Sequence, residues 1–250
     1  MSGEVSTRIN AVLVAGGKWH DIDFARLELL KLLADDERVR VRVLEDYENL
    51  DAIAGADFLV SYTCDVVPSL RAQEALRDYV AGGRRWLALH GTNSIIRFMD
   101  DGRIDTPRWA PLFVDTLGTQ FLAHPPIGPY TVERTGVEHR LVDGIAAFEV
   151  VDELYLSETV APIEVLLDAE FEGSGGRFIH NCWRRKRHPV LYLRHLDQGA
   201  VLYLTLGHCR GHYDLQPMMD YYPTVERCAW DLPVYRDLLR RSIAWAKGML

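Results

Sequence analysis

The stretch from Arg85 to Ser94 constrains the fold of this chain more than any other. Its apolar run Trp-Leu-Ala-Leu stops at His90-Gly91 and is followed by Thr-Asn-Ser, residue types that cap helices. Such a run predicts a buried strand, a sharp turn and the start of a helix. Ligands of an open parallel sheet bind outside the carboxyl ends of its strands, so we expect His90 to face a pocket. An imidazole placed there is a base, an acid or a metal ligand more often than a nucleophile.

Three other apolar runs precede this strand, and helical patterns separate them. The predicted strands are 9–15, 39–44, 57–62 and 86–90. The predicted helices are 23–34 and 68–81, the second with Pro68 in its first turn. Strands joined through helices predict a parallel sheet with right-handed crossovers. We therefore expect an α/β fold with a doubly wound, mainly parallel sheet flanked by helices, and with the strand 39–44 at or near an edge.

The pattern changes after Ser94, because most of the second half alternates as β-strands do. A short helix is predicted over 109–117 and an amphipathic helix over 234–247. The predicted strands are 130–135, 149–157, 165–171, 190–195 and 200–206, with turns at 172–176 and 197–199. These strands are expected to add antiparallel pairs to the parallel core. With 250 residues, 48% of them hydrophobic, the chain can bury one full core, so a single domain over 1–250 is predicted.

Charge and cysteine content limit the classes of binding partner and the cell compartment expected for this chain. The net charge of −8 argues against nucleic acid and anionic membranes, and no apolar run approaches the ~20 residues that span a bilayer. The four cysteines form no C-x-x-C pair, so we expect reduced thiols, and we expect Cys64 and Cys209 not to act as nucleophiles. A cytoplasmic protein with a small-molecule partner is predicted, and assembly into a homo-oligomer stays open.

Several histidines follow apolar segments and could meet at one edge of the sheet. They are His20, His90, His124, His208 and His212. Converging with Asp65 or Glu153, three or four of them would suit zinc or manganese, which take nitrogen and oxygen ligands. Each histidine taken alone is more often a hydrogen-bonded structural residue. Gly207 and Gly211 argue against a helix that would carry His208 and His212 as a zinc-binding pair.

Two charged stretches allow a structural interpretation as well as a functional one. Asp152 and Glu153 lie in an apolar context, where a carboxyl group must be paired or protonated. The structural interpretation is a half-exposed strand with Asp152 and Leu154 on one face and Glu153 and Tyr155 on the other. The basic run 184–188 is interpreted as a solvated loop between two β segments, with an anion site as the functional alternative.

Taken together, these motifs resemble the ThuA-like (trehalose utilisation) family, which has a class I glutamine amidotransferase-like fold. The resemblance covers 9–246 and rests on five motifs: Gly16-Gly17 with His20, 87–91, 121–125, 152–155 and 206–208. Amidotransferases of this fold have a cysteine at the turn after the strand and a late His-x-Glu. Here His90 occupies that turn, and Cys209-Arg210 follows His208, so glutamine hydrolysis is not expected.

The resemblance implies sugar catabolism. Relatives are linked to the breakdown of trehalose and related glycosides, commonly beside dehydrogenases that form 3-keto sugars. A 3-keto group acidifies the C2 proton, so a base can start elimination of the group at C1. The resemblance gives His90, Glu153 and His208 the catalytic roles. The residues expected to bind substrate are Gly17, His20, Asp65, Asn93, His124, Tyr155 and His212. Two alternatives stay open: a sugar-binding or regulatory module without turnover, and a metal-dependent isomerase.

Overall fold

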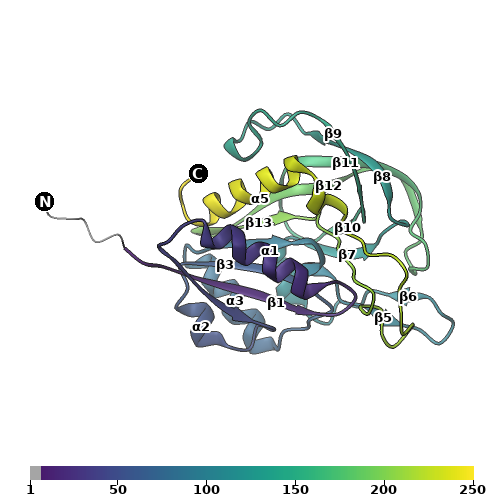
Figure 1. Cartoon of the computed structure of the whole chain (residues 1–250), viewed down its shortest axis with the longest axis horizontal. Helices are drawn as coiled ribbons and strands as arrows, with labels where there is room; N and C mark the ends of the chain where they lie inside the picture. The colour runs from purple at the N-terminus through teal and green to yellow at the C-terminus, as the bar shows by residue number, and fades with distance from the viewer. Residues whose placement is uncertain (1–6) are drawn as a thin grey trace, which may run out of the picture.

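A nine-stranded sheet forms the centre of the protein (Figure 1). The computed structural model describes residues 7–250. In order across the sheet, the strands are β2 (Val39–Leu44), β1 (Ile9–Gly17), β3 (Phe58–Cys64), β4 (Arg85–Leu89), β13 (Gly199–Leu204), β12 (Cys182–Leu196), β11 (Glu164–Ser174), β8 (Gly128–Arg134) and β9 (Phe148–Asp152). The first five of these run parallel to one another, and every pairing from β13 to β9 is antiparallel. The predicted α/β class, with antiparallel strands added to a parallel core, is confirmed, and β2 is an edge strand.

Helices cover both faces of the parallel half. The long helices α1 (Ile22–Ala34) and α5 (Pro233–Ala246) lie side by side on one face (Figure 1). The opposite face packs on α2 (Leu50–Ala54), α3 (Leu70–Ala81) and α4 (Pro111–Leu117). Successive residues of β1 point to opposite faces, so Leu13 packs with α1 while Val12 packs with α2. Burial on both faces explains why this strand is apolar throughout.

Smaller elements complete the described residues. Strand β7 (Thr119–Ala123) pairs with β10 (Leu156–Thr159), and β5 (Arg97–Phe98) pairs with β6 (Ile104–Asp105). The single-turn 3₁₀ helices are η1 (His90–Asn93), η2 (Arg140–Val142) and η3 (Cys228–Asp231). Within residues 7–250, no helix is long and apolar enough to cross a membrane.

The strand predicted over 149–157 is wrong, because the chain breaks there into β9 and β10. Asp152 ends β9 by accepting backbone N–H groups from other segments: Gly207 at 3.0 Å, His208 at 3.1 Å and Ala229 at 3.2 Å. The chain from Asp152 to Tyr155 is consequently buried throughout, rather than alternating between an exposed and a buried face. This break turns Glu153 inward.

Three further predictions need correction. The basic run 184–188 is part of β12 and not a loop, since Arg187 is fixed by Glu133 and Asp168 and the residues of this run pair with β11. Helix α3 begins at Leu70, with Ser69 as its N-cap, so Pro68 precedes it. The helix expected after His90 is only the single turn η1, because Ser94 continues in extended conformation and its carbonyl accepts the Asp65 N–H.

Candidate functional site

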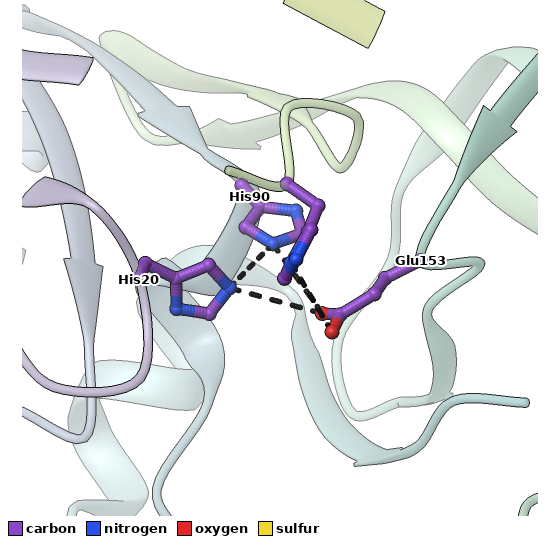
Figure 2. Close-up of side chains that lie close together, drawn as sticks. His20, His90 and Glu153 are labelled. Atoms are coloured by element: carbon purple, nitrogen blue, oxygen red, sulfur yellow. Dashed lines mark hydrogen bonds and ion pairs between the residues drawn. The ribbon is translucent and has the colours of Figure 1, made fainter. Parts of the chain in front are cut away.

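Four polar side chains meet beyond the carboxyl ends of the parallel strands. His20 follows β1, His90 follows β4, His208 follows β13, and Glu153 follows the antiparallel strand β9. One ligand atom from each residue lies within 4.8 Å of those from the others, and all four residues are buried. Figure 2 shows the His20 and His90 rings and the Glu153 carboxylate turned toward one another. We call these four residues the histidine cluster.

The sharp turn after β4 fixes the orientation of His90. Its φ of +42° is unusual for a residue with a side chain, and the next residue must be small, since a Cβ at Gly91 would lie 2.6 Å from the Thr63 carbonyl oxygen. The His90 Nδ1–H donates to the Thr205 carbonyl over 2.8 Å. This bond leaves the Nε2 lone pair directed into the cluster.

The His20 ring is also held on both sides, by His90 and by the backbone at Lys18. The two Nε2 atoms are 2.8 Å apart, and His20 Nδ1 faces the Lys18 carbonyl at 3.3 Å. Burial lowers the pKa of His20 to about 3, although Glu153 opposes that shift, so the ring is neutral near pH 7. If each Nδ1 carries its proton, two lone pairs face each other. A proton or a cation between the Nε2 atoms would satisfy both.

Glu153 and His208 form the charged part of the cluster. His208 Nδ1 lies 3.1 Å from Glu153 Oε1, and its Nε2 lies 2.8 Å from Glu226 Oε2. Burial lowers the pKa of His208, but the two carboxylates outweigh it and raise the pKa to about 9. For Glu153, burial raises the pKa, but the surrounding histidines hold it well below its ordinary value. The pair is therefore an imidazolium and a carboxylate at neutral pH.

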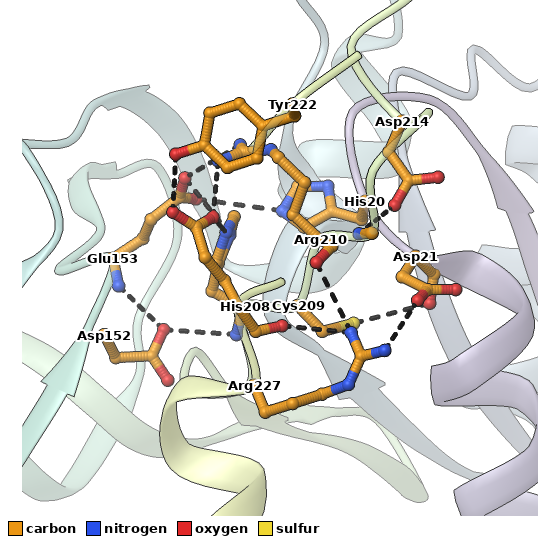
Figure 3. A network of polar contacts seen from close by, with 12 residues as sticks. His20, Asp21, Asp152, Glu153, His208, Cys209, Arg210, Asp214, Tyr222 and Arg227 are labelled. Carbon is orange, nitrogen blue, oxygen red and sulfur yellow. Dashed lines mark hydrogen bonds and ion pairs between the residues drawn. The ribbon is translucent and has the colours of Figure 1, made fainter. Parts of the chain in front are cut away.

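The segment 210–227 closes over this pair (Figure 3). Arg210 Nη1 donates to Glu226 Oε2 over 2.7 Å, and the Tyr222 hydroxyl donates to Glu226 Oε1 over 2.7 Å. Two backbone hydrogen bonds, of 3.0 and 2.8 Å, also join Arg210 to Glu226. Arg210, Tyr222 and Glu226 were not predicted as site residues. The segment has no long regular element, so no periodicity in the sequence indicates that Glu226 returns to His208.

Other predicted site residues border the cluster. His124 Nε2 lies 3.7 Å from Glu153 Oε1, and its side chain, 27% exposed, is the most open histidine there. The Tyr155 hydroxyl is 3.4 Å from His90 Nε2. Gly17, at φ +105°, shapes the turn that carries His20, because a Cβ there would collide with the Cys64 carbonyl.

Three predicted substrate-binding residues have partners within the protein, and their role in binding substrate stays a prediction. Asp65 pairs with Lys18 at 3.1 Å and accepts the Ile96 N–H. The Asn93 amide donates to Thr119 Oγ1 over 2.8 Å in the interior. His212 bonds the Tyr222 carbonyl through Nδ1 at 2.7 Å, in the closing segment and not in the cluster.

A cavity of about 500 Å³ lies beside the closing segment. It is lined by Ile127, Glu149, Val150, Val151, Glu226, Arg227, Cys228 and Leu232. Glu226 lines the cavity and also bonds His208, so this residue connects the cavity with the cluster. The cavity lies within the ~300–1,000 Å³ range typical of small-molecule sites.

The two cysteines nearest the cluster are buried thiols. Burial raises the pKa of Cys64 well above its ordinary value and that of Cys209 to about 12. A nucleophilic cysteine needs the opposite shift. The expectation that neither thiol attacks a substrate stays a prediction, and these environments favour it.

Comparison with known proteins identifies the family. The model of the ThuA family, described as trehalose utilisation, matches residues 11–222. The chain belongs to the ThuA family. This confirms the resemblance found in the sequence, and the family description links the chain to sugar metabolism. A search of curated proteins finds no significant match.

Solved structures agree on the fold of this ThuA-family chain. A ThuA-like protein from Bacteroides uniformis is 17% identical, with a TM-score of 0.64 over 98% of this chain and 94% of that one. Another from Parabacteroides merdae is 16% identical, with a TM-score of 0.64 over 98% and 92%. A Thermoplasma acidophilum protein described as part of a GMP synthase is 12% identical, with a TM-score of 0.51 over 96% and 95%. At these identities the likeness establishes the glutamine amidotransferase-like fold alone.

Proposed function

We propose that this protein is a sugar-catabolic enzyme that cleaves a glycoside, or its 3-keto derivative, by acid/base chemistry. The observation that carries the proposal is the histidine cluster, in which His20 and His90 lie against a buried imidazolium–carboxylate pair. Burying such charges costs several kcal/mol per ion unless each is paired. Clusters of this kind are typical of functional sites, where neighbouring groups hold different protonation states.

The hydrogen bonds and charges within the cluster give His90 and His208 different catalytic roles. His90 is the base, because its Nε2 lone pair points into the cluster while Nδ1 is held by Thr205. His208 is the acid, because Glu153 and Glu226 keep it protonated. With a 3-keto sugar, His90 would take the C2 proton as the C1–O bond breaks, and His208 would give its proton to the leaving oxygen. Glu153 positions His208 and balances its charge.

The cluster also fits a divalent zinc or manganese ion. Its donors are three imidazole nitrogens and one carboxylate, and the facing Nε2 atoms of His20 and His90 need a cation or proton between them. Such an ion would be held by His20, His90, His208 and Glu153, with His208 deprotonated, and it would polarise the keto oxygen of the substrate in place of the acid and base roles of His208 and His90. Tyr155 and His124, which border the same donors, would then orient sugar hydroxyls.

Charge balance favours an uncharged sugar. The carboxylates of Glu153 and Glu226 face two cations, His208 and Arg210, so the site is neutral as a whole. The mainly apolar cavity beyond Glu226 would take the leaving group of the glycoside.

The test has two parts. Metal analysis of the purified protein comes first, and a turnover screen on glycosides and their 3-keto derivatives follows, with and without chelator. We expect turnover by the wild type and its loss in His90→Gln. The matched control is His195→Gln, because that histidine is exposed and pairs with Glu164, outside the cluster. Sugar binding without turnover by the wild type would contradict the proposal and identify a binding module.

A further inference from the structure

A second charged region lies at the amino end of the parallel sheet, away from the histidine cluster. The register pairs Asn10 with Arg40 and Val12 with Arg42, so these four side chains point to the same face. That face is the one covered by α2, because Val12 packs with Ala52. Helix α2 has only five residues and leaves the sheet edge partly open.

The open area forms a cavity of about 250 Å³. Its polar lining consists of Arg8, Asn10, Arg40, Arg42 and Asp51, and its floor includes Val12 and Ala56. We call it the arginine groove. It lies near the start of β1 and β2, at the opposite end of these strands from the site, and it shares no residue with the histidine cluster.

The groove concentrates positive charge in a chain of net charge −8. Within residues 7–250, Arg8, Arg40 and Arg42 make no ion pair, although the neighbouring Arg38 pairs with Asp36 at 2.8 Å and Arg84 pairs with Asp57 at 3.2 Å. Asp51 is the one carboxylate of the lining. Three guanidinium groups around one concavity, opposed by a single carboxylate, attract an anion.

We propose that the arginine groove binds a small molecule that carries a phosphate group. Guanidinium matches phosphate oxygens through paired N–H donors, and it does so better than any other side chain. Asp51 and Asn10 lie in the same lining and can bind hydroxyl groups. A volume of about 250 Å³ limits the ligand to one of about the size of a monosaccharide phosphate. The phosphate is the shared chemistry; inorganic phosphate and a phosphorylated sugar are its two sources.

Protection of the sheet edge does not account for the whole arrangement. Charged residues on an edge strand prevent pairing with another chain, which explains Arg40 and Arg42 on β2. Arg8 directly precedes β1, which is paired on both sides and has no free edge. All three arginines nevertheless line the same concavity.

Calorimetric titration of the full chain tests the proposal. The ligands are inorganic phosphate and glucose 6-phosphate, with glucose and chloride as controls. We expect saturable binding of at least one phosphate compound with a Kd below about 1 mM; any binding of glucose would belong to the histidine cluster and should not depend on the arginines of the groove. Tighter binding of the sugar phosphate supports a phosphorylated metabolite as the ligand, and equal binding supports free phosphate.

Two variants decide whether the groove is the site. Arg40→Ala with Arg42→Ala should weaken binding about tenfold or more, because hydrogen bonds to charged groups are lost. Arg184→Ala, at an exposed position of β12, should leave the Kd unchanged. Since all three arginines are exposed, these variants keep the fold, which circular dichroism verifies. No saturable binding by the wild type, or equal weakening in both variants, would overturn the proposal.

Discussion

The carboxyl end of the parallel sheet and its amino end both gather charged side chains, but only the carboxyl end buries them. In the histidine cluster, His208 is 0% and Glu153 is 4% exposed, and both have partners of opposite charge. In the arginine groove, Arg40 and Arg42 are exposed and have no ionic partner within residues 7–250. Unmatched charge is tolerated in water and costly inside. The two regions should therefore respond differently to substitution.

The largest effect is expected from removing the buried carboxylate. Glu153→Gln takes away the charge that holds His208 protonated, so we expect kcat to fall by about 10²–10⁴. Steady-state kinetics on the substrate found in the turnover screen measures the loss. Glu172→Gln, at an exposed carboxylate paired with Arg185, is the control and should keep full activity. A Glu153→Gln enzyme within threefold of the wild type would remove Glu153 from the mechanism.

Replacing Asp152 should lower the stability of the fold, whereas replacing Glu153 should lower the activity. Its carboxylate is buried and accepts the backbone N–H groups of Gly207, His208 and Ala229. Asp152→Ala leaves these donors unpaired, so the free energy of unfolding should fall by about 3–5 kcal/mol. Urea denaturation measures it. Asp23→Ala, on an 85% exposed carboxylate, should change it by less than about 0.5 kcal/mol. Equal losses of unfolding free energy in the two variants would show that burial of the carboxylate does not determine the effect.

His188, a buried histidine without an oppositely charged partner in the described chain, tests how costly a buried titratable group is when it is unpaired. Burial lowers the pKa of His188 to about 4, and neither ring nitrogen has a hydrogen-bond partner in the described chain. Between pH 6.5 and 4 the unfolded chain takes up a proton that the folded chain does not, so this residue destabilises the fold as the pH falls. The contribution is about 3 kcal/mol from pH 7 to pH 4.

His188→Leu removes this contribution. Urea denaturation of the wild type and the variant at pH 7 and at pH 4 isolates it, because the other titrating groups are common to both proteins. We expect the variant to lose less stability on acidification. Parallel loss in the two proteins would mean that His188 reaches solvent or a partner in the fold.

The smallest effect on stability is expected from the arginine groove, at the amino end of the parallel sheet. Arg40→Ala with Arg42→Ala should change the free energy of unfolding by less than about 0.5 kcal/mol, because both side chains are exposed and unpaired within the described chain. Thermal unfolding in the absence of phosphate measures it. A loss above about 2 kcal/mol would show that these arginines stabilise the sheet itself.

The sequence predicted the elements whose signals are local. The strand before His90 and the turn at Gly91 follow from an apolar run and a glycine, and the parallel strands follow from the same logic. Histidines placed after those strands met because parallel strands end at one edge of the sheet. His20, His90 and His208 could therefore be named before the structure was known.

The remaining parts of the site depend on contacts between distant segments. The break after Asp152 exists because Gly207, His208 and Ala229 donate to its carboxylate, and no local pattern encodes those bonds. Glu226 returns to His208 through an irregular segment for the same reason. The charged strand around Arg187 was missed because its partners, Glu133 and Asp168, lie on other strands.

The most direct test of the central claim compares chemistry with binding in one variant. Single-turnover rate and substrate affinity would be measured for the wild type and for His90→Gln, with the substrate that the turnover screen identifies. If His90 is the base of an acid/base centre, the rate should fall by about 10²–10⁴ while the affinity changes by only a few-fold. A variant that binds weakly but, at saturation, reacts as fast as the wild type would contradict the account.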